Sequence, residues 1–418
     1  MNRLPGYAAT DHTFRVPLDH ADPGGAAIDL FAREIVAPDK AADDLPWLVF
    51  LQGGPGAPGP RPLGVTDWLA RALRTHRVVM LDQRGTGRSS PITARTVEGM
   101  GPEALAAYLR LFRADSIVED AEIVRARLTG GAPWESLGQS YGGFITLAYL
   151  SMHPEGLSAC YVTGGVPSVT KTADDVYLRT FDTCAAKNAR FYRRYPGDAV
   201  VVREIADLLE SDDVRLPDGD RLTPHRFRLL GNAFGMSDGF EKVHWMLECA
   251  RDGRGLTDAF RYAAMAQTGF VDTPIWALQE FTYGRPGHVT AWAAERRYAK
   301  DARFAPDADP LLFTGEMMFP WMFREIGALR PFAEAAEILA AYDAWPALFE
   351  PERLASNEVP LVAAVYADDM YVPSDLQMES LDAIGNARGW LTNEYEHDGL
   401  RTEPRVLDHL MAMAAGHC

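Results

Sequence analysis

Gly138-Gln-Ser140-Tyr-Gly142 is the most informative stretch of this 418-residue chain, because it matches the pattern G-x-S-x-G. In that pattern a serine occupies a sharp strand-to-helix turn, and the flanking glycines let the backbone pass without Cβ clashes. Residues 144–150 are typical of a helix, whereas residues 134–137 contain two polar side chains and make a weak strand. The stretch predicts a nucleophile at Ser140. The alternative is a glycine-rich turn that a serine caps.

Short apolar segments alternate with helical ones on both sides of this stretch. The strand-like segments are residues 28–36, 47–51, 77–81, 360–366 and 390–393. Apolar spacing and composition predict helices over residues 67–74, 116–128, 374–384 and 403–414. Short buried strands separated by helices indicate an α/β fold with a mostly parallel sheet.

The middle of the chain differs, since it is rich in Arg, Asp, Ala and aromatic residues and has few strand-like segments. Helices are predicted over residues 175–195, 199–210, 240–251, 256–267 and 289–300. We therefore expect an α/β core in two segments, residues 1–167 and 356–418, with a helical cap over residues 168–355 between them. A helical insert explains the pattern better than two domains in tandem.

A serine hydroxyl becomes a good nucleophile only when a base takes its proton and a third group orients that base. On an α/β sheet the acid and then the histidine follow such a serine in the chain. This order leaves His397, His409 and His417 as candidate bases. His409 lies in the last predicted helix and His417 beside the end of the chain, so His397, on a loop after a strand, is the predicted base. A solvated loop histidine is the alternative.

The acid is expected where the strand-like segment 360–366 ends, and two adjacent carboxylates, Asp368 and Asp369, follow it. Adjacent residues of an extended chain point in opposite directions, so only one of them can face the imidazole. Spacing alone does not choose between the two.

Acyl transfer also requires two preorganised N–H donors for the oxyanion. One is the amide of Tyr141, directly after the serine. The other is expected from the glycine loop 53–56, where the backbone can approach a ligand closely. The alternative, a phosphate-binding loop, lacks the Gly-Lys-Ser/Thr sequence and a helix directly after it.

Gln52-Gly-Gly-Pro-Gly56, Asp82-Gln-Arg-Gly-Thr-Gly-Arg-Ser89 and Gly138-Gln-Ser-Tyr-Gly-Gly143 occur in this order. Together they resemble the proline iminopeptidase (prolyl aminopeptidase) family of α/β-hydrolases. The resemblance implies an α/β-hydrolase fold with an inserted helical cap, a Ser-Asp-His triad and release of N-terminal proline from peptides. One departure is Gln52, where many members carry histidine.

Carried over by motif, the resemblance assigns Ser140 as nucleophile, His397 as base, and Gly54 with Tyr141 as the oxyanion donors. The family's acid lies four residues before a proline, here Pro373, which selects Asp369 over Asp368.

The resemblance also implies cap glutamates that meet the substrate's amino terminus, because burying that cation without a partner is costly. The candidates are Glu280, within the aromatic segment 276–283, and Glu316, within the aromatic segment 313–321. These aromatic residues are candidates for the walls of a pyrrolidine pocket. The alternative is that both glutamates lie on ordinary helix surfaces and that the aromatics are plain core.

Composition narrows the remaining function classes. With 41 Lys+Arg and 58 Asp+Glu, the formal net charge of −17 argues against a nucleic-acid partner. No segment approaches the roughly 20 apolar residues of a membrane helix, and none near the start is typical of a secretory signal. The four cysteines form no CxxC pair, which favours reduced thiols and a cytoplasmic location.

We therefore expect a serine aminopeptidase acting on a peptide or small amide with a free N-terminal proline, with no metal or organic cofactor. The alternatives are the same machinery acting on another small ester or amide, and a catalytically silent binding protein. The sequence carries no indication of the oligomeric state.

Overall fold

A nine-stranded sheet forms the centre of the computed structural model, which describes residues 2–417. The strand order is β1-β2-β3-β5-β4-β6-β7-β10-β11. Neighbours from β5 to β11 run parallel, and β1, β2, β3 and β5 pair antiparallel. The strands are β1 Asn2–Leu4, β2 Tyr7–Pro17, β3 Ala27–Val36, β4 Trp47–Leu51, β5 Arg77–Leu81, β6 Trp134–Gln139, β7 Leu157–Thr163, β10 Leu361–Tyr366 and β11 Ala387–Thr392. The expected α/β fold with a mostly parallel sheet is confirmed.

Successive side chains of the central strands point to opposite faces, and helices cover both faces. Leu48 and Phe50 of β4 pack on the face that α1 and α16 cover, whereas Val49 and Leu51 pack on the face of α3 and α4. The helices of the core are α1 Asp67–Ala72, α2 Pro102–Leu109, α3 Ala114–Thr129, α4 Tyr141–Met152, α15 Ser374–Ala383 and α16 Arg405–Ala414. Burial on both faces explains why these strands are short continuous apolar runs.

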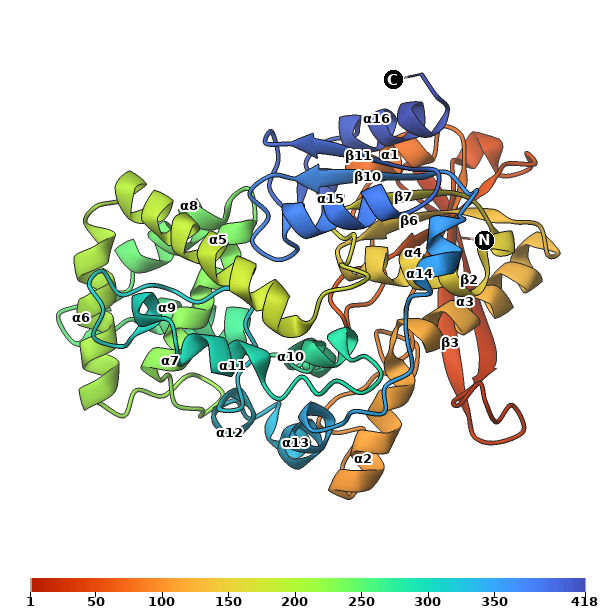
Figure 1. Cartoon of the computed structure of the whole chain (residues 1–418). Coiled ribbons are helices and arrows are strands. Elements are labelled where there is room, and N and C mark those ends of the chain that lie inside the picture. The colour runs from red at the N-terminus through yellow and green to blue at the C-terminus, as the bar shows by residue number, and fades with distance from the viewer. Residues whose placement is uncertain (1, 418) are drawn as a thin grey trace.

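A second, helical part lies beside the sheet and next to the ends of several strands (Figure 1). Its helices are α5 Ala173–Arg194, α6 Asp198–Ser211, α7 Pro224–Arg228, α8 Gly239–Glu248, α9 Asp258–Thr268, α10 Pro274–Ala277, α11 Ala293–Tyr298, α12 Met322–Glu325 and α13 Ala333–Ala340, with a small hairpin of β8 Arg251–Asp252 and β9 Gly255–Leu256. All strands of the main sheet lie before residue 168 or after residue 355, as a helical insert requires.

The end of the predicted cap runs along the core. Helix α14, Pro351–Ala355, packs against α4, and the N–H of Glu350 donates to Ser151 Oγ of α4 at 3.1 Å. The boundaries expected at residues 167/168 and 355/356 stay predictions.

Strands β1, β2 and β7 and helix α2 were not expected from the sequence, and one predicted helix begins later than expected. Strand β2 carries many polar residues and so lacks the apolar run that predicts a strand. Its polar side chains pair across the sheet instead, as where Asp11 accepts from Arg33 of β3 at 2.7 Å. The helix predicted over residues 289–300 begins only at Ala293, because Ala291 and Trp292 have positive φ angles of 46° and 55°.

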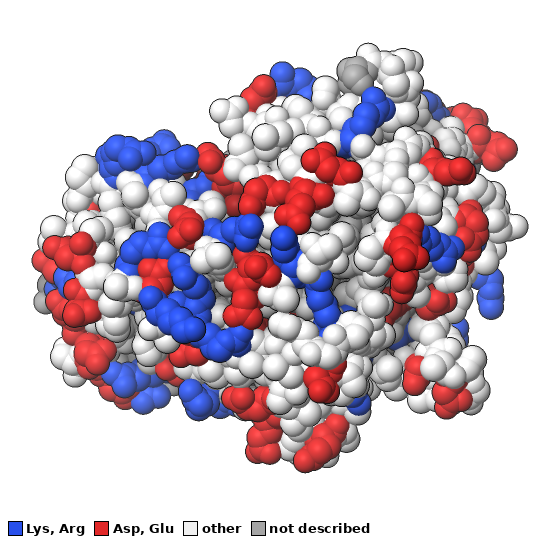
Figure 2. Space-filling model, in the orientation of Figure 1, with Lys and Arg blue, Asp and Glu red and all other residues white. Residues whose placement is uncertain are grey.

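The surface carries charges of both signs. Figure 2 shows Lys and Arg side chains interspersed with Asp and Glu over the displayed face, so no continuous basic surface forms there. In the part of the chain that the structure describes, no helix has the length and apolarity that a membrane span needs.

Candidate active site

Ser140 lies in a tight turn between β6 and α4, with φ 55° and ψ −123°, where few non-glycine residues are found. The neighbouring glycines permit this turn through close backbone contacts. A Cβ atom on Gly142 would lie 1.9 Å from the carbonyl oxygen of Leu51, and one on Gly165 would lie 2.1 Å from that of Ser140. Only glycine fits these two positions, so the packing fixes Ser140 at the carboxyl edge of the sheet.

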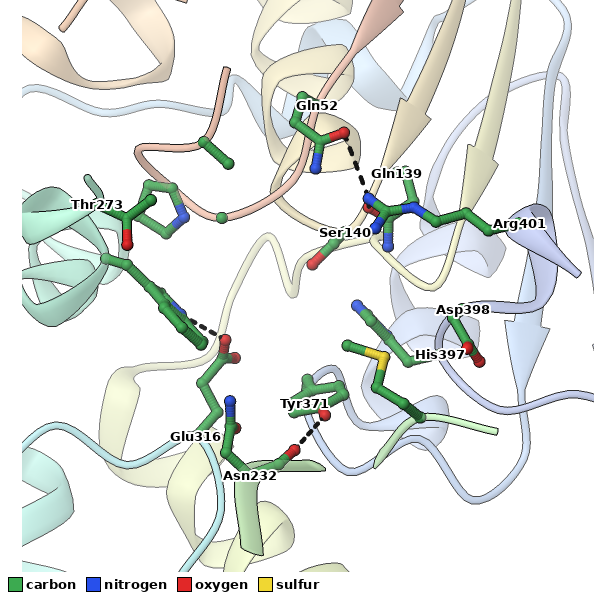
Figure 3. Close-up of a pocket in the computed structure, with 15 residues that line it drawn as sticks. Gln52, Gln139, Ser140, Asn232, Thr273, Glu316, Tyr371, His397, Asp398 and Arg401 are labelled. Atoms are coloured by element: carbon green, nitrogen blue, oxygen red, sulfur yellow. Dashed lines mark hydrogen bonds between the residues drawn. The ribbon is translucent and has the colours of Figure 1, made fainter. Parts of the chain in front are cut away.

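His397 and Asp369 follow two neighbouring parallel strands and meet at the same edge. His397 lies on the loop after β11, Asp369 lies after β10, and both side chains are buried. His397 Nδ1 lies 2.8 Å from Asp369 Oδ2. The other carboxylate oxygen, Oδ1, accepts the N–H groups of Tyr371 and Val372 at 2.9 and 3.0 Å. The carboxylate therefore holds the imidazole in one orientation, and Figure 3 shows a ring nitrogen of His397 directed toward Ser140.

Asp368 points away from the imidazole. Its Oδ2 accepts from Arg190 Nη1 of the cap helix α5 at 2.7 Å, and this pair holds the pKa of Asp368 below its ordinary value. Of the two candidate acids, Asp369 is the one in contact with His397.

The pKa of His397 is raised above its ordinary value. Burial of the ring alone would lower it, but the charge of Asp369, the hydrogen bond to Asp369 and the more distant charge of Glu316 outweigh burial. A raised pKa makes the imidazole a stronger proton acceptor.

The glycine loop passes directly over the serine. A Cβ atom on Gly53 would lie 2.8 Å from Ser140 Cβ, and the next residue, Gly54, lines the cavity beside the serine. Tyr141 is the first residue of α4, where backbone N–H groups have no partner within the helix. The backbones of Gly54 and Tyr141 are thus both close to Ser140.

The segment 82–89 contacts the start of this glycine loop but does not line the cavity. Gln83 Nε2 donates to the carbonyl of Gln52 at 2.7 Å, and Asp82 forms a bidentate pair with Arg61 at 2.8 and 2.5 Å. Arg84 is fully buried and pairs with Asp120 at 2.7 and 2.6 Å. The motif therefore positions the glycine loop.

A cavity of about 240 Å³ opens above Ser140 between the core and the cap. The core lines it with Gln52, Gly54, Gln139, Ser140, His397 and Arg401, and the cap lines it with Asn232, Met236, Thr273, Trp276 and Glu316 (Figure 3).

Glu316 enters this cavity from the cap. Its Oε1 accepts from Trp276 Nε1 at 2.7 Å. Burial raises the pKa of Glu316 to about 7, against the opposing effects of the Trp276 hydrogen bond and the charge of His397. By accessible surface Glu316 is half-buried, and none of its hydrogen bonds among the described residues is to a cation, so it is a candidate binding group for a positively charged ligand.

Glu280 has a different position, and its expected contact with a ligand finds no support here. Its two carboxylate oxygens accept the N–H groups of Ala293 and Ala294 at 3.0 Å each. These donors begin helix α11, so the side chain acts as a helix cap and does not line the cavity. Burial raises its pKa to about 7 as well, although the two N–H groups oppose the shift.

Known proteins similar to this chain define its family. A proline iminopeptidase of Aeromonas sobria is 44% identical over 414 residues, which cover 98% of this chain and 97% of that protein. The chain belongs to the proline iminopeptidase family. Another member, a proline iminopeptidase of Aspergillus aculeatus, is 34% identical over 98% of this chain and 94% of its own length.

Further similarities concern the fold. Residues 46–204 match the family model described as the alpha/beta hydrolase fold. The crystal structure of a proline iminopeptidase from Mycobacterium smegmatis has a TM-score of 0.46 and 14% identity, covering 97% of this chain and 98% of that one.

Sequence reasoning missed several cavity residues of this proline iminopeptidase family member. Tyr371 packs edge-on against the His397 ring with centroids 4.6 Å apart, and its hydroxyl donates to the Asn232 carbonyl of the cap. Arg401 and Gln139 also line the cavity. No pattern in the sequence indicates Arg401, whereas the aromatic segment 276–283 did suggest a cavity wall, which Trp276 forms.

Metal ligation is not indicated among residues 2–417, where no group of three or more His, Cys, Asp or Glu side chains could hold an ion.

Proposed function

We propose that this protein is a serine aminopeptidase that releases N-terminal proline from peptides. The single observation that carries the proposal is one small cavity that holds Ser140, the His397–Asp369 pair and, from the cap, the carboxylate of Glu316. Membership in the proline iminopeptidase family supports the same activity.

In the proposed reaction His397 takes the proton of Ser140, whose oxygen attacks the prolyl carbonyl carbon. Asp369 stabilises the imidazolium that forms, and the N–H groups of Tyr141 and Gly54 stabilise the oxyanion. Protonated His397 then donates its proton to the leaving amine, and the C–N bond breaks. A water molecule then gives a proton to His397 and attacks the carbonyl carbon of the prolyl-enzyme. His397 returns the proton to the oxygen of Ser140, which releases free proline.

Glu316 is the proposed partner of the substrate's ammonium group. With a pKa of about 7, its carboxyl group is partly protonated at neutral pH in the free protein. A substrate cation favours the ionised form, and binding therefore draws the proton away. Pro55, Ala57 and Trp276 give this part of the cavity apolar surfaces that fit a pyrrolidine ring. Glu280 has no part in this binding and keeps its role at the start of α11.

A peptide or small amide with a free N-terminal proline is the proposed substrate, and the cytoplasm is the proposed location. Cys160, Cys184 and Cys249 are free thiols, which fits a reducing compartment.

A panel of arylamides tests the proposed activity. We expect kcat/KM for the prolyl compound to exceed that for acetyl-prolyl by about 10²-fold or more, because acetylation removes the cation that Glu316 binds. Alanyl and leucyl arylamides measure the contribution of the pyrrolidine ring. Equal turnover of the prolyl and acetyl-prolyl compounds would overturn the proposal in favour of a hydrolase for other small esters or amides.

A further inference from the structure

Arg401 is a cation in the cavity that the reaction described above does not use. It ends the 3-10 turn Gly399–Arg401, and its Nη2 donates to Gln139 Oε1 at 2.9 Å and to Gln52 Oε1 at 3.3 Å. Both partners are neutral amides. Both contacts use Nη2.

No carboxylate pairs with Arg401 among residues 2–417. Asp398 is the closest acidic influence on it, but the two oxygens of Asp398 accept the N–H and hydroxyl of Ser237 at 3.0 and 2.8 Å. Arg401 is solvent-exposed at the rim of the cavity, and an exposed guanidinium without an ion pair can meet an anionic ligand that enters from solvent.

The position of Arg401 relates this ligand to the reaction. Figure 3 shows Arg401 and Glu316 on opposite sides of Ser140. Because His397 donates its proton to the leaving amine, the leaving group must lie near His397. Arg401 follows His397 by four residues on the same loop. The prolyl ammonium therefore faces Glu316, and the leaving group faces Arg401.

We propose that Arg401, oriented by Gln139 and Gln52, binds the free C-terminal carboxylate of the leaving group, so that the preferred substrates are dipeptides of the form Pro-Xaa. This inference rests on the proposed aminopeptidase function. The cavity then carries a negative group at one end and a positive group at the other, which is complementary to a zwitterionic dipeptide. Its volume of about 240 Å³ also suits a small substrate, being below the roughly 300–1,000 Å³ of typical ligand sites.

The experiment compares Pro-Ala with Pro-Ala-amide, which differ only in the charge of the carboxyl terminus. We expect the unmodified protein to give Pro-Ala a kcat/KM about tenfold or more above that of the amide, since charge-assisted hydrogen bonds between Arg and carboxylate are strong. In Arg401→Gln this ratio should fall to about one, and Arg401→Lys should keep part of it because the point charge remains. Both substrates are assayed with the same preparation of each variant. The fraction of folded protein therefore affects both kcat/KM values equally and does not change their ratio.

The matched control is Arg405→Gln. Arg405 lies four residues further along, is exposed, pairs with Glu403 at 2.8 Å and does not line the cavity. This variant should keep the ratio of the unmodified protein.

Prolyl arylamide has no C-terminal carboxylate, so its hydrolysis tests the aminopeptidase activity alone and not the carboxylate site at Arg401. If the arylamide is cleaved but Pro-Ala and Pro-Ala-amide react equally, the carboxylate site is wrong and the aminopeptidase stands. A ratio that survives Arg401→Gln also overturns the assignment to Arg401. If no prolyl substrate is cleaved, both proposals fail.

Discussion

Glu316 is the residue that most directly links the geometry to a substrate with a free amine. Replacing it by glutamine keeps the size and the bond from Trp276 but removes the negative charge. We expect kcat/KM for prolyl arylamide to fall about 10²-fold, because a buried charge pair with the substrate is lost. An aryl ester without an amine should be affected far less.

Glu337→Gln is the matched control for this change. Glu337 also accepts from an indole N–H, that of Trp292 at 2.9 Å, but on the surface of the cap. It should behave as the unmodified protein. Equal losses of Glu316→Gln on the amine and ester substrates would count against a role in amine binding.

The raised pKa values of Glu316 and His397 predict a pH dependence. Both groups must lose a proton to act, so kcat/KM for prolyl arylamide should rise with pH as His397, whose pKa is raised, and Glu316, whose pKa is about 7, ionise. A neutral ester depends on His397 alone and should show a single ionisation, governed by the raised pKa of His397. The measurement is the pH profile of kcat/KM for both substrates. Identical profiles for the two would contradict the involvement of Glu316.

At single residues, sequence reasoning succeeded where a motif defines a backbone shape and failed where a distant element decides. The turn at Ser140 follows from its glycines. Parallel strands that end together bring His397 near the pair Asp368 and Asp369, but only the family resemblance selected Asp369. The use of Glu280 as a helix cap could not be predicted, because α11 begins later than its sequence suggests. Arg401 carries no local signal at all.

Among the elements, helix α5 of the cap is joined to both loops that carry the candidate base and acid. Lys187 pairs with Glu396, directly before His397, and Arg190 pairs with Asp368, directly before Asp369. Helix α5 also contacts the core through Arg179, which pairs with Asp375 of α15 at 2.5 Å. Figure 2 shows basic side chains of the cap beside acidic ones of the core in this region.

Lys187→Met should destabilise the protein, because Lys187 is buried and its loss leaves Glu396 unpaired. We expect the free energy of unfolding to fall by about 2 kcal/mol, less than for a fully buried pair since Glu396 is partly exposed. Urea unfolding measures this change. Arg194, on the same helix as Lys187, forms an exposed pair with Glu241 of α8, and Arg194→Met should cost under about 0.5 kcal/mol. Equal losses in the two variants would refute the special role of the buried pair.

The predictability of strands follows burial only in part, since the buried strand β7 was not expected. Strands β4, β5 and β10 are buried apolar runs and were expected, whereas β2 is half-exposed and polar. The weak strand signal before Ser140 has a physical explanation in β6, where Glu135 accepts from the hydroxyl of Tyr161 on the neighbouring strand β7 at 2.9 Å. A partner so far along the chain is invisible in a local pattern.

For the whole molecule, one hydrophobic cluster continues from the sheet into the cap. It contains Val49 and Val162 of the sheet together with Phe181, Phe227 and Phe313 of the cap. We therefore expect core and cap to unfold in a single cooperative transition, with calorimetric and van't Hoff enthalpies that agree. Two separated heat-capacity peaks in scanning calorimetry would contradict this expectation.

At this scale the sequence predicted the class of fold but not its arrangement. The order of strands depends on pairings between distant segments, such as Leu361 of β10 with Cys160 of β7. The net charge of −17 is a sum over the chain and does not locate the cavity. The candidate site arises where core and cap meet, and neither segment contains it alone.

Active-site labelling tests most directly whether Ser140 acts as the nucleophile of a prolyl aminopeptidase. The folded protein is treated with a fluorophosphonate, and the labelled peptide and the remaining hydrolysis of prolyl arylamide are measured together, with Ser140→Ala as the control. We predict one label on Ser140, loss of activity in proportion to labelling, and a kcat lower by about 10⁶ in Ser140→Ala. Full labelling of Ser140 with undiminished hydrolysis, or activity of Ser140→Ala within about tenfold of the unmodified protein, would contradict the account.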